Sequence, residues 1–224
     1  MSGRDYDLPD SVTVVTSGHP GTPHPEGDDG YSTPSFPHSP TPSLPDDTDP
    51  ERKRTNAWIY ATLTADDYIR TLGHDLYQAA PSHAYEREPN PHVTIMPQFN
   101  IPEDEVHELA QFLASLELSG RSVPMDGIDT YPGDEYPQVV YLDADIDIDD
   151  PRSALRQKVE ALGGNVFTDP VNPHTTLFSA DHAAYPGDWE LPERERKQLL
   201  ATIDDHQDRG RLVTQFDDIN LAVD

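Results

Sequence analysis

The sequence predicts a domain of mixed α and β structure, built from two similar halves and preceded by a disordered tail. The hexapeptide Asn-Pro-His-x-Thr-aliphatic occurs twice, as NPHVTI at residues 90–95 and as NPHTTL at residues 172–177. Each copy ends a run of predicted strands and helices, which indicates an internal duplication. Apolar segments recur only from residue 57 onward. We therefore assign residues 1–52 to the tail and residues 53–224 to the folded domain.

The tail is rich in Pro, Ser, Thr, Gly and Asp. Such a segment cannot bury enough apolar surface to offset the entropy lost on ordering, so we expect it to be disordered. Only the run 12–15 has strand character, and no pairing partner for it is evident within the tail.

The first half alternates two strands with two helices. The segment TNAWIYATLT at 55–64 alternates and is rich in strand-forming residues. Thr64 then opens a helix over 65–79, with Asp67 three residues on, as in a capping box. The first hexapeptide continues as a short strand, PHVTIMP, and a helix follows from Pro102 to Gly120. The apolar stripe of that helix comprises Val106, Leu109, Phe112, Leu113 and Leu116.

The second half repeats this order with additional strands. Pro151 opens its first helix, and Gly163 and Gly164 end it. The predicted strands are 121–132, 137–146, the segment 165–180 that carries the second hexapeptide, and one or two strands in 211–223; the predicted helices are 151–162 and 192–206.

The charge balance restricts the partners of this chain. Its 42 acidic and 15 basic residues give a net charge of −27, with the acids spread over the whole sequence. We expect an acid-coated, halophilic protein in a cytoplasm of molar salt, where the Debye length is roughly 3 Å. A DNA groove would need a basic stripe and is not expected, although one phosphate at an RNA terminus is compatible with this charge.

The absence of cysteine excludes disulfides, thiolate nucleophiles and Cys-ligated zinc. No segment approaches 18 apolar residues and the N-terminus lacks an apolar signal region, so we expect no membrane partner and a cytoplasmic location. We also expect a monomer.

The two hexapeptides carry the candidate chemistry. Side chains alternate along a strand, so His92 and Thr94 share one face, and His174 and Thr176 share another. Two imidazoles that flank one phosphodiester can act as base and acid near neutral pH. Two hydroxyls can stabilise the charge on the non-bridging oxygens. Their neighbours Val93, Ile95, Thr175 and Leu177 are expected on the opposite, core-facing side.

A single His-x-Thr is more often an ordinary piece of strand than a site. Two copies with matched flanks, one in each half, favour a paired catalytic arrangement. The alternatives are a non-catalytic module that binds a phosphorylated nucleotide in the same cleft, and a His-ligated zinc enzyme. The zinc enzyme is the weaker alternative, because catalytic zinc takes three protein ligands and no third ligand is apparent.

The motifs HVTI at 92–95 and HTTL at 174–177 resemble the two H-x-[ST]-x motifs of the 2H phosphoesterases. This resemblance implies an α+β, bilobal fold with pseudo-twofold duplicated antiparallel sheets, flanking helices and a cleft between the sheets. It implies that His92 and His174 are the acid/base pair and that Thr94 and Thr176 bind the phosphate. It further implies hydrolysis of 2′,3′-cyclic phosphate ends of RNA or of small cyclic nucleotides, or reversible 2′-5′ joining, with no metal and no cofactor.

The sequence also suggests roles for several other residues. Tyr60 shares a strand face with Trp58, where core packing is the usual role; in the family that the chain resembles, this strand borders the cleft, so Tyr60 could stack on a base. Arg121 lies near the central strands and could assist the phosphate. The acidic run Asp143–Asp150 favours an exposed strand edge over a calcium loop. Four other histidines of the folded domain are expected on the surface: His74, His107, His182 and His206.

Overall fold

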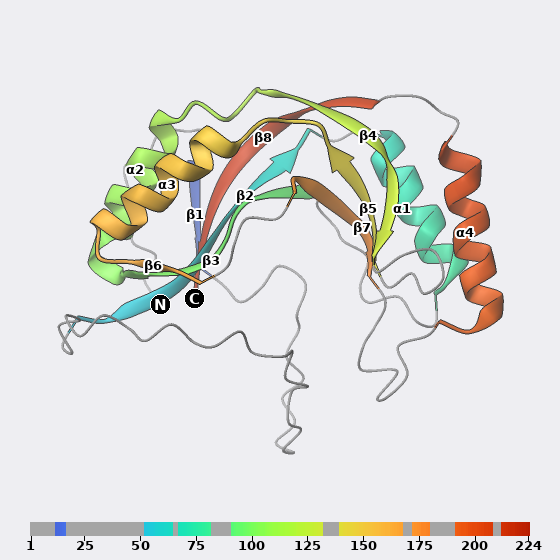
Figure 1. The fold of residues 1–224 in the computed structure, drawn as a ribbon, viewed down its shortest axis with the longest axis horizontal. Coiled ribbons are helices and arrows are strands. Elements are labelled where there is room, and N and C mark those ends of the chain that lie inside the picture. The colour runs from blue at the N-terminus through green and yellow to red at the C-terminus, as the bar shows by residue number, and fades with distance from the viewer. Residues whose placement is uncertain are drawn as a thin grey trace, which may run out of the picture.

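The computed structural model describes residues 12–16, 52–64, 67–81, 91–131, 139–167, 172–179, 191–207 and 212–224. Within these ranges the chain forms eight strands and four α-helices (Figure 1). The strands are β1 Val12–Thr16, β2 Arg54–Leu63, β3 His92–Pro102, β4 Ser122–Tyr131, β5 Val139–Ala144, β6 Asn165–Val166, β7 His174–Ser179 and β8 Leu212–Val223. The helices are α1 Asp67–Ala79, α2 Val106–Ser115, α3 Asp149–Ala161 and α4 Glu193–Gln207, and the 3₁₀ turn η1 Glu103–Glu105 precedes α2.

The strands follow the order β6-β3-β2-β8-β4-β5-β7, and all neighbours in this order are antiparallel. Strand β8 joins two lobes. Its residues 212–215 pair with β4, whereas residues 219–223 pair with β2 on one side and with β1, in parallel, on the other. The predicted α+β, bilobal and duplicated architecture is therefore confirmed.

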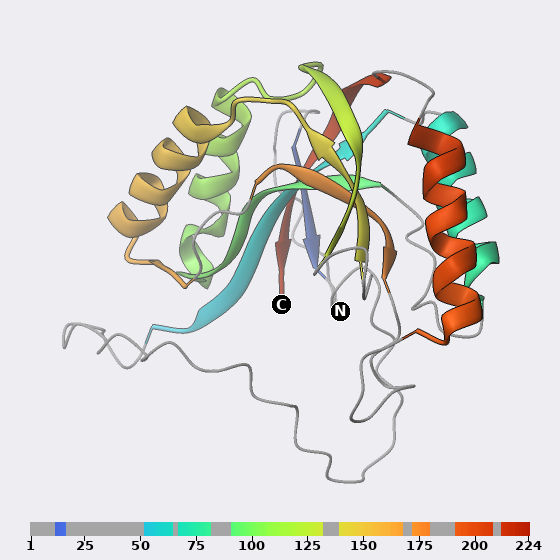
Figure 2. The same cartoon turned by 45° about the vertical axis from the view of Figure 1, so that its right-hand side comes forward.

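Two of the helices pack against strands from the other half of the chain. Helices α2 and α3 cover the lobe that contains β3, and α1 and α4 lie beside the lobe that contains β7 (Figures 1 and 2). Helix α1 follows β2 in sequence but packs against β7, and α3 follows β5 but packs against β3. Each hexapeptide strand is thus supported by a helix from the opposite half, which makes the two halves one domain.

Helix α2 shows how the apolar stripes fill the core. Val106, Leu109 and Leu113 are buried and Phe112 is partly buried, as the spacing predicted. The helix is shorter than expected. A 3₁₀ turn precedes it, and it ends at Ser115 because Glu117 adopts a φ of 49°.

The glycines after α3 end the helix as predicted. Gly163 has a φ of 79°. A Cβ at Gly164 would lie 2.5 Å from the carbonyl oxygen of Asn100, so only glycine allows the turn to approach β3 this closely.

Three further sequence predictions differ from the structure. Residues 12–16 of the predicted tail form β1, because β8 offers a free edge to pair with; the other residues before Arg52 lie outside the described part. The acidic run is not a continuous strand edge, since β5 ends at Ala144 and α3 begins at Asp149, where its acids favour a helix start. His206 is buried, with only 6% of its surface exposed, because α4 turns it toward α1. Its Nε2 lies 3.1 Å from the Asp75 carboxylate.

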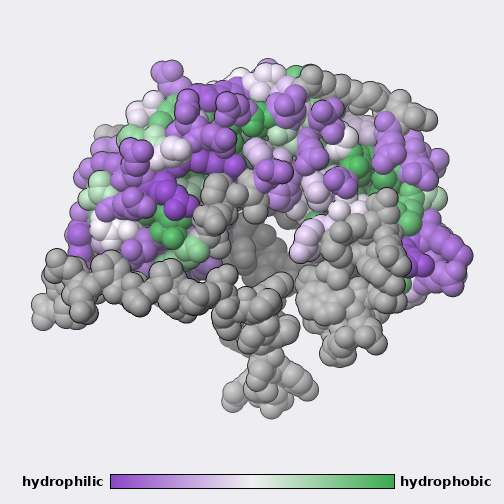
Figure 3. All heavy atoms as spheres, viewed as in Figure 1, coloured by the Kyte–Doolittle hydropathy of each residue, from purple (hydrophilic) through white to green (hydrophobic). Residues whose placement is uncertain are grey.

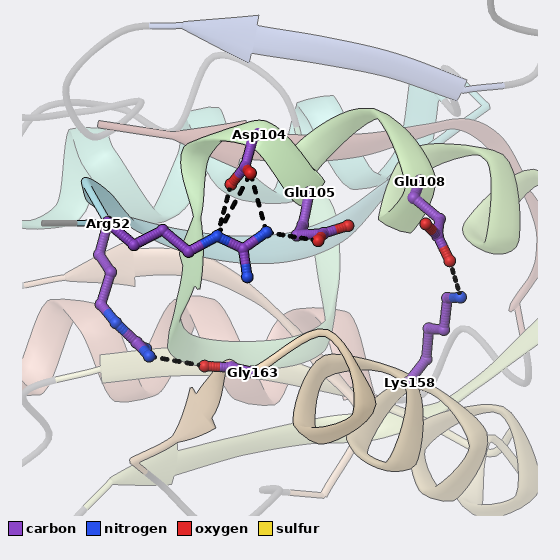
Figure 4. Close-up of polar contacts among 7 residues, drawn as sticks. Arg52, Asp104, Glu105, Glu108, Lys158 and Gly163 are labelled. Carbon is purple, nitrogen blue, oxygen red and sulfur yellow. Dashed lines mark hydrogen bonds and ion pairs between the residues drawn. The ribbon is translucent and has the colours of Figure 1, made fainter. Parts of the chain in front are cut away.

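Ion pairs and backbone contacts fix the start of β2 against η1 and the turn after α3 (Figure 4). Arg52 donates hydrogen bonds to Asp104 and Glu105, and it holds the pKa of the Asp104 carboxyl below its usual value. Arg54 donates to the Gly163 carbonyl at 2.8 Å. The Arg52 contacts are solvent-exposed, so they contribute orientation more than stability.

Hydrophilic residues cover most of the described surface in the view of Figure 3. None of the described helices is both long and apolar enough to cross a membrane.

Candidate active site

The two hexapeptide strands meet although they are distant in the order of the sheet. Strands β3 and β7 lie near opposite ends of the hydrogen-bonded order, and among the described strands no backbone pairing joins them. The sheet nevertheless bends so that Cα atoms of β3 and β7 come within 8 Å of each other. The strands that carry the two motifs therefore lie side by side in the middle of the bent sheet (Figures 1 and 2).

The proline of each hexapeptide fixes the register of its strand. The Pro91 carbonyl accepts a hydrogen bond from the Leu63 amide at 3.1 Å, and the Pro173 carbonyl accepts one from the Ala144 amide at 2.9 Å. Proline has no N–H to return, so the ladder stops there and the motif histidine becomes the first residue of the strand.

This register sets which side chains face each motif histidine. Thr62 lies opposite His92, and Asp143 lies opposite His174. Because hydrogen-bonded and non-hydrogen-bonded pairs alternate, these pairs next to the proline bond are non-hydrogen-bonded. Side chains in such pairs are close, with Cα atoms about 4.5 Å apart. The neighbour of each histidine across the ladder is therefore in direct reach of it.

A bulge follows at the same motif position in both halves. The pairing skips Ile95, between Ile59↔Met96 and Tyr60↔Thr94, and skips Leu177 in the corresponding place of β7. Bulges bend a strand and re-aim its side chains, and they are common beside active sites. The duplicated halves thus share a local distortion of the backbone as well as a sequence motif.

The predicted faces of the two motifs are confirmed. His92, Thr94, His174 and Thr176 are all half-buried, as residues beside an open surface are. The intervening residues are buried in the core: Val93, Ile95, Thr175 and Leu177.

A tyrosine accompanies each motif histidine. The Tyr60 and His92 ring centroids lie 5.1 Å apart with the planes tilted by 60°, and the Tyr141 and His174 centroids lie 5.2 Å apart at 59°. Both tyrosines are half-buried, and each lies opposite the motif threonine. Tyr60 therefore lies beside the site and not in the core.

Tyr141 was missed by the sequence analysis. The signal was present, because the segments IYATL at 59–63 and VYLDA at 140–144 share a pattern of aliphatic, tyrosine and aliphatic residues. Each of these segments forms the strand that pairs with a hexapeptide.

The ring of His174 is held in one orientation. Its Nδ1 lies 2.8 Å from the carbonyl oxygen of Asn172. A carbonyl can only accept, so Nδ1 carries a hydrogen and Nε2 is the nitrogen left for chemistry. The equivalent Asn90 lies outside the described residues.

The second half of the site is acidic. Asp143 is half-buried, and desolvation, followed by repulsion from Asp129 and Asp126, raises the pKa of its carboxyl, whereas His174 lowers it. Burial, with Asp129 and Asp143 nearby, also raises the pKa of Tyr141, whose hydroxyl lies 3.4 Å from Asp129.

The first half has a cation behind its motif. Arg152 of α3 is buried, and it donates hydrogen bonds to the carbonyl oxygens of Ile95 at 2.8 Å and Thr94 at 3.1 Å. Burial lowers the pKa of this guanidinium. These carbonyls lie on the edge of β3 beyond its short pairing with β6, so Arg152 supplies the donors that a neighbouring strand would otherwise supply.

The other candidates lie elsewhere. Arg121 is exposed, and its guanidinium donates hydrogen bonds to the carbonyls of Leu116 and Glu117 just after α2. These contacts explain its position without a bound phosphate. His74 is exposed on α1, as expected. In the part of the chain that the structure describes, no three His, Asp or Glu side chains are grouped so as to hold a metal ion.

Comparisons with known proteins found one matching family model and a solved structure with a partial likeness. Residues 65–141 match the family model described as LigT like Phosphoesterase, a segment that contains the first hexapeptide strand and ends before the second. No curated protein matches the chain. Among solved structures, Kluyveromyces marxianus Usb1 aligns at 14% identity with a TM-score of 0.41, covering 71% of this chain and 90% of that one. A likeness at this level carries no information about the substrate.

Proposed function

We propose that this chain is a member of the 2H phosphoesterase superfamily and a metal-independent phosphodiesterase whose two hexapeptides form one active site. The observation that carries the proposal is the repetition of a whole local geometry. Each histidine follows a register-setting proline, has a tyrosine ring at about 5 Å, and precedes a bulge at the same motif position. Structural repetition of this depth is hard to explain by strand packing alone.

In the proposed reaction, His92 and His174 act on the attacking and the leaving oxygen of a phosphodiester. One imidazole takes a proton from the attacking water while the water oxygen bonds to phosphorus. The other imidazole gives a proton to the ribose oxygen as the P–O bond breaks. The hydroxyls of Thr94 and Thr176 donate hydrogen bonds to the non-bridging oxygens, where charge accumulates.

We propose a 2′,3′-cyclic phosphate at an RNA terminus, or a small cyclic nucleotide, as the substrate. Both place a single phosphodiester at an accessible end, which suits a chain of net charge −27 better than a long polyanion. The product is a phosphomonoester with one free ribose hydroxyl. With a 5′-hydroxyl in place of water, the same groups would open the cyclic phosphate by releasing its 3′ oxygen, which leaves a 2′-5′ linkage; water at about 55 M favours hydrolysis.

The test is turnover of a nucleoside 2′,3′-cyclic phosphate by the full chain, in molar potassium chloride with and without chelator. We expect activity in chelator. His92→Ala and His174→Ala should each lower kcat by about 10² to 10⁴, and Thr94→Val or Thr176→Val by about 10². His74→Ala, on the exposed face of α1, is the matched control and should retain wild-type activity.

Wild-type turnover in both histidine variants, with the fold intact by circular dichroism, would reject the proposal. Binding of the nucleotide without any product would indicate a binding module instead. Loss of wild-type activity in chelator, with recovery on adding zinc, would indicate the metalloenzyme.

A further inference from the structure

We propose that Tyr60 and Tyr141 are positioning residues for the two motif histidines. Each tyrosine ring limits the rotation of the imidazole that it contacts, so that the imidazole is oriented before the substrate binds. The inference rests on the proposed function and extends it to residues outside the hexapeptides. It starts from a repeated contact, because the ring centroids lie 5.1 Å apart in the first half and 5.2 Å apart in the second, at tilts of 60° and 59°.

The register of the sheet brings each tyrosine to its histidine. Tyr60 pairs with Thr94, and Tyr141 pairs with Thr176. Each tyrosine is therefore the diagonal neighbour of the histidine two residues earlier on the motif strand, and both side chains lie on one face of the sheet. The Cβ atoms of diagonal neighbours are about 7–8 Å apart, a gap that aromatic and other long side chains can span. A shorter side chain at the tyrosine position would leave the imidazole without this contact.

Each tyrosine also lies next to the bulge. The pairing shifts between Ile59 and Tyr60 in the first half, and between Val140 and Tyr141 in the second. A bulge increases the local twist of a strand pair and re-aims the side chains beside it. The same irregularity beside both tyrosines accounts for the nearly equal tilts of the two ring pairs. The repeated geometry therefore includes one residue of the neighbouring strand.

Core packing does not account for these two rings. Both tyrosines are half-buried, and the residues on either side of them in the strand are buried on the opposite face of the sheet: Ile59, Ala61, Val140 and Leu142. The outer torsion of a histidine side chain has a broad minimum, so the chain itself does little to fix the imidazole. An aromatic contact at this separation favours one ring orientation over others by about 2- to 12-fold.

In the second half, hydrogen bonds hold both members of the ring pair. The Asp129 carboxylate accepts a hydrogen bond from the Thr130 amide at 2.7 Å, and its other oxygen lies 3.4 Å from the Tyr141 hydroxyl. Burial raises the pKa of Tyr141, so the hydroxyl keeps the proton that it donates to Asp129. On the other side, Nδ1 of His174 donates to the Asn172 carbonyl at 2.8 Å. The imidazole is thus held at one nitrogen and along its ring, and Nε2 is left for proton transfer.

Proton transfer depends on this orientation. An imidazole nitrogen must come within hydrogen-bond reach of the attacking or the leaving oxygen. A displacement of roughly 1 Å at a catalytic group can lower the rate by about 10²-fold. An imidazole that rotates freely spends part of its time with Nε2 directed away from the phosphodiester. The tyrosines raise the share of productive orientations, so they act on kcat and not on substrate binding.

The kinetic test separates the ring from its hydroxyl, with the full chain and a nucleoside 2′,3′-cyclic phosphate in molar potassium chloride. Tyr60→Leu and Tyr141→Leu remove the ring but keep an apolar side chain. We expect each to lower kcat by about tenfold and to change KM by less than about threefold. Tyr60→Phe and Tyr141→Phe keep the ring, so they should retain kcat within about threefold of wild type. Methionine replaces leucine in any variant that circular dichroism shows to be unfolded.

Tyr68→Leu is the matched control. The Tyr68 ring also contacts a histidine, with its centroid 5.6 Å from that of His206, but this pair joins α1 to α4. The control should lower the free energy of unfolding and leave kcat within about twofold of wild type.

Imidazole order, measured by NMR relaxation of ¹³C-labelled histidine in the full chain, tests the contact without turnover. Tyr60→Leu should lower the order parameter of the His92 ring and leave that of His174 unchanged. Tyr141→Leu should do the reverse, by a smaller amount because the Asn172 carbonyl still holds Nδ1 of His174.

Three results would overturn the inference. A rise in KM at unchanged kcat in the leucine variants would mean that the rings contact the substrate. Equal losses in the phenylalanine and leucine variants would assign the effect to the hydroxyls. Unchanged order parameters in both leucine variants would show that the rings do not hold the imidazoles. Failure of the wild-type chain to hydrolyse the cyclic phosphate would instead reject the proposed function, and the order parameters would still decide whether the tyrosines orient the imidazoles.

Discussion

The two halves of this protein have nearly the same backbone around their motifs but different side chains behind them. Both use a proline carbonyl to set the register and a bulge after the motif threonine. The motif strand of the first half is backed by a buried cation, Arg152 of α3, and the motif strand of the second half pairs with the strand that carries Asp143. The two halves therefore share the backbone geometry of the hexapeptide, while the charged residues that differ between them lie outside it.

The largest expected effect of this difference is on stability, through Arg152. Arg152→Met removes the donors to the Thr94 and Ile95 carbonyls, which would leave one buried and one partly buried acceptor unsatisfied. We expect a loss of about 2–4 kcal/mol in the free energy of unfolding, measured by denaturant titration in high salt. Arg152→Lys keeps the positive charge but not the planar guanidinium that donates to both carbonyls. The lysine variant should therefore recover only part of the lost free energy of unfolding.

A loss below about 0.5 kcal/mol in the methionine variant would show that β3 does not depend on this guanidinium. The burial of Arg152 would then have to be explained by a role other than support of β3.

A smaller effect concerns the core residue between the motif histidine and threonine. This is Val93 in the first half and Thr175 in the second; both are fully buried, and the Thr175 hydroxyl has no hydrogen-bond partner among the described residues. Thr175→Val should raise the free energy of unfolding by about 1 kcal/mol, and Val93→Thr should lower it by about 1–3 kcal/mol.

Thermal and denaturant unfolding of the two variants would measure this pair of opposite shifts. Destabilisation by Thr175→Val would reveal a partner for that hydroxyl and would contradict the symmetry of the two core positions.

The smallest effect is the pH dependence of stability at Asp143. Folding raises the pKa of this carboxyl above its unfolded value, so ionisation is harder in the folded state. The resulting penalty is present above the folded pKa and disappears below the unfolded one. Asp143→Asn should therefore stabilise the protein at pH 7, by less than about 1 kcal/mol because the group is half-exposed, and should have no effect near pH 3.

Unfolding curves at the two pH values would measure this difference. Equal effects at both would indicate that the change acts through packing and not through charge.

The sequence was sufficient to predict most elements and both motif faces, because strand alternation and helix stripes are local properties. It predicted His92 and His174 on the face opposite the core residues Val93 and Leu177, and the structure has both histidines half-buried and both neighbours buried. It did not predict that α1 packs against β7 and α3 against β3, since that exchange depends on tertiary packing.

The supporting residues of the site were harder to predict. Arg152 lies on a helix that the spacing identified, yet its contact with β3 depends on the unpaired edge of that strand. Asp143 was read as part of an acidic surface run, because its neighbour across the ladder depends on a register set by Pro173. The pattern around Tyr60 and Tyr141 was visible in the sequence, and a search for repeats beyond the hexapeptide would have found it.

The position of β8 has a consequence for how the protein is made. The last of the eight strands in chain order lies at the centre, where it pairs with β1, β2 and β4. During synthesis on the ribosome, β2 and β4 therefore emerge with open edges that stay unpaired until residues 212–223 arrive. Nascent chains with such edges are prone to aggregate. Because the acidic residues are spread over the whole sequence, unfinished chains are also strongly negative and repel each other during this interval.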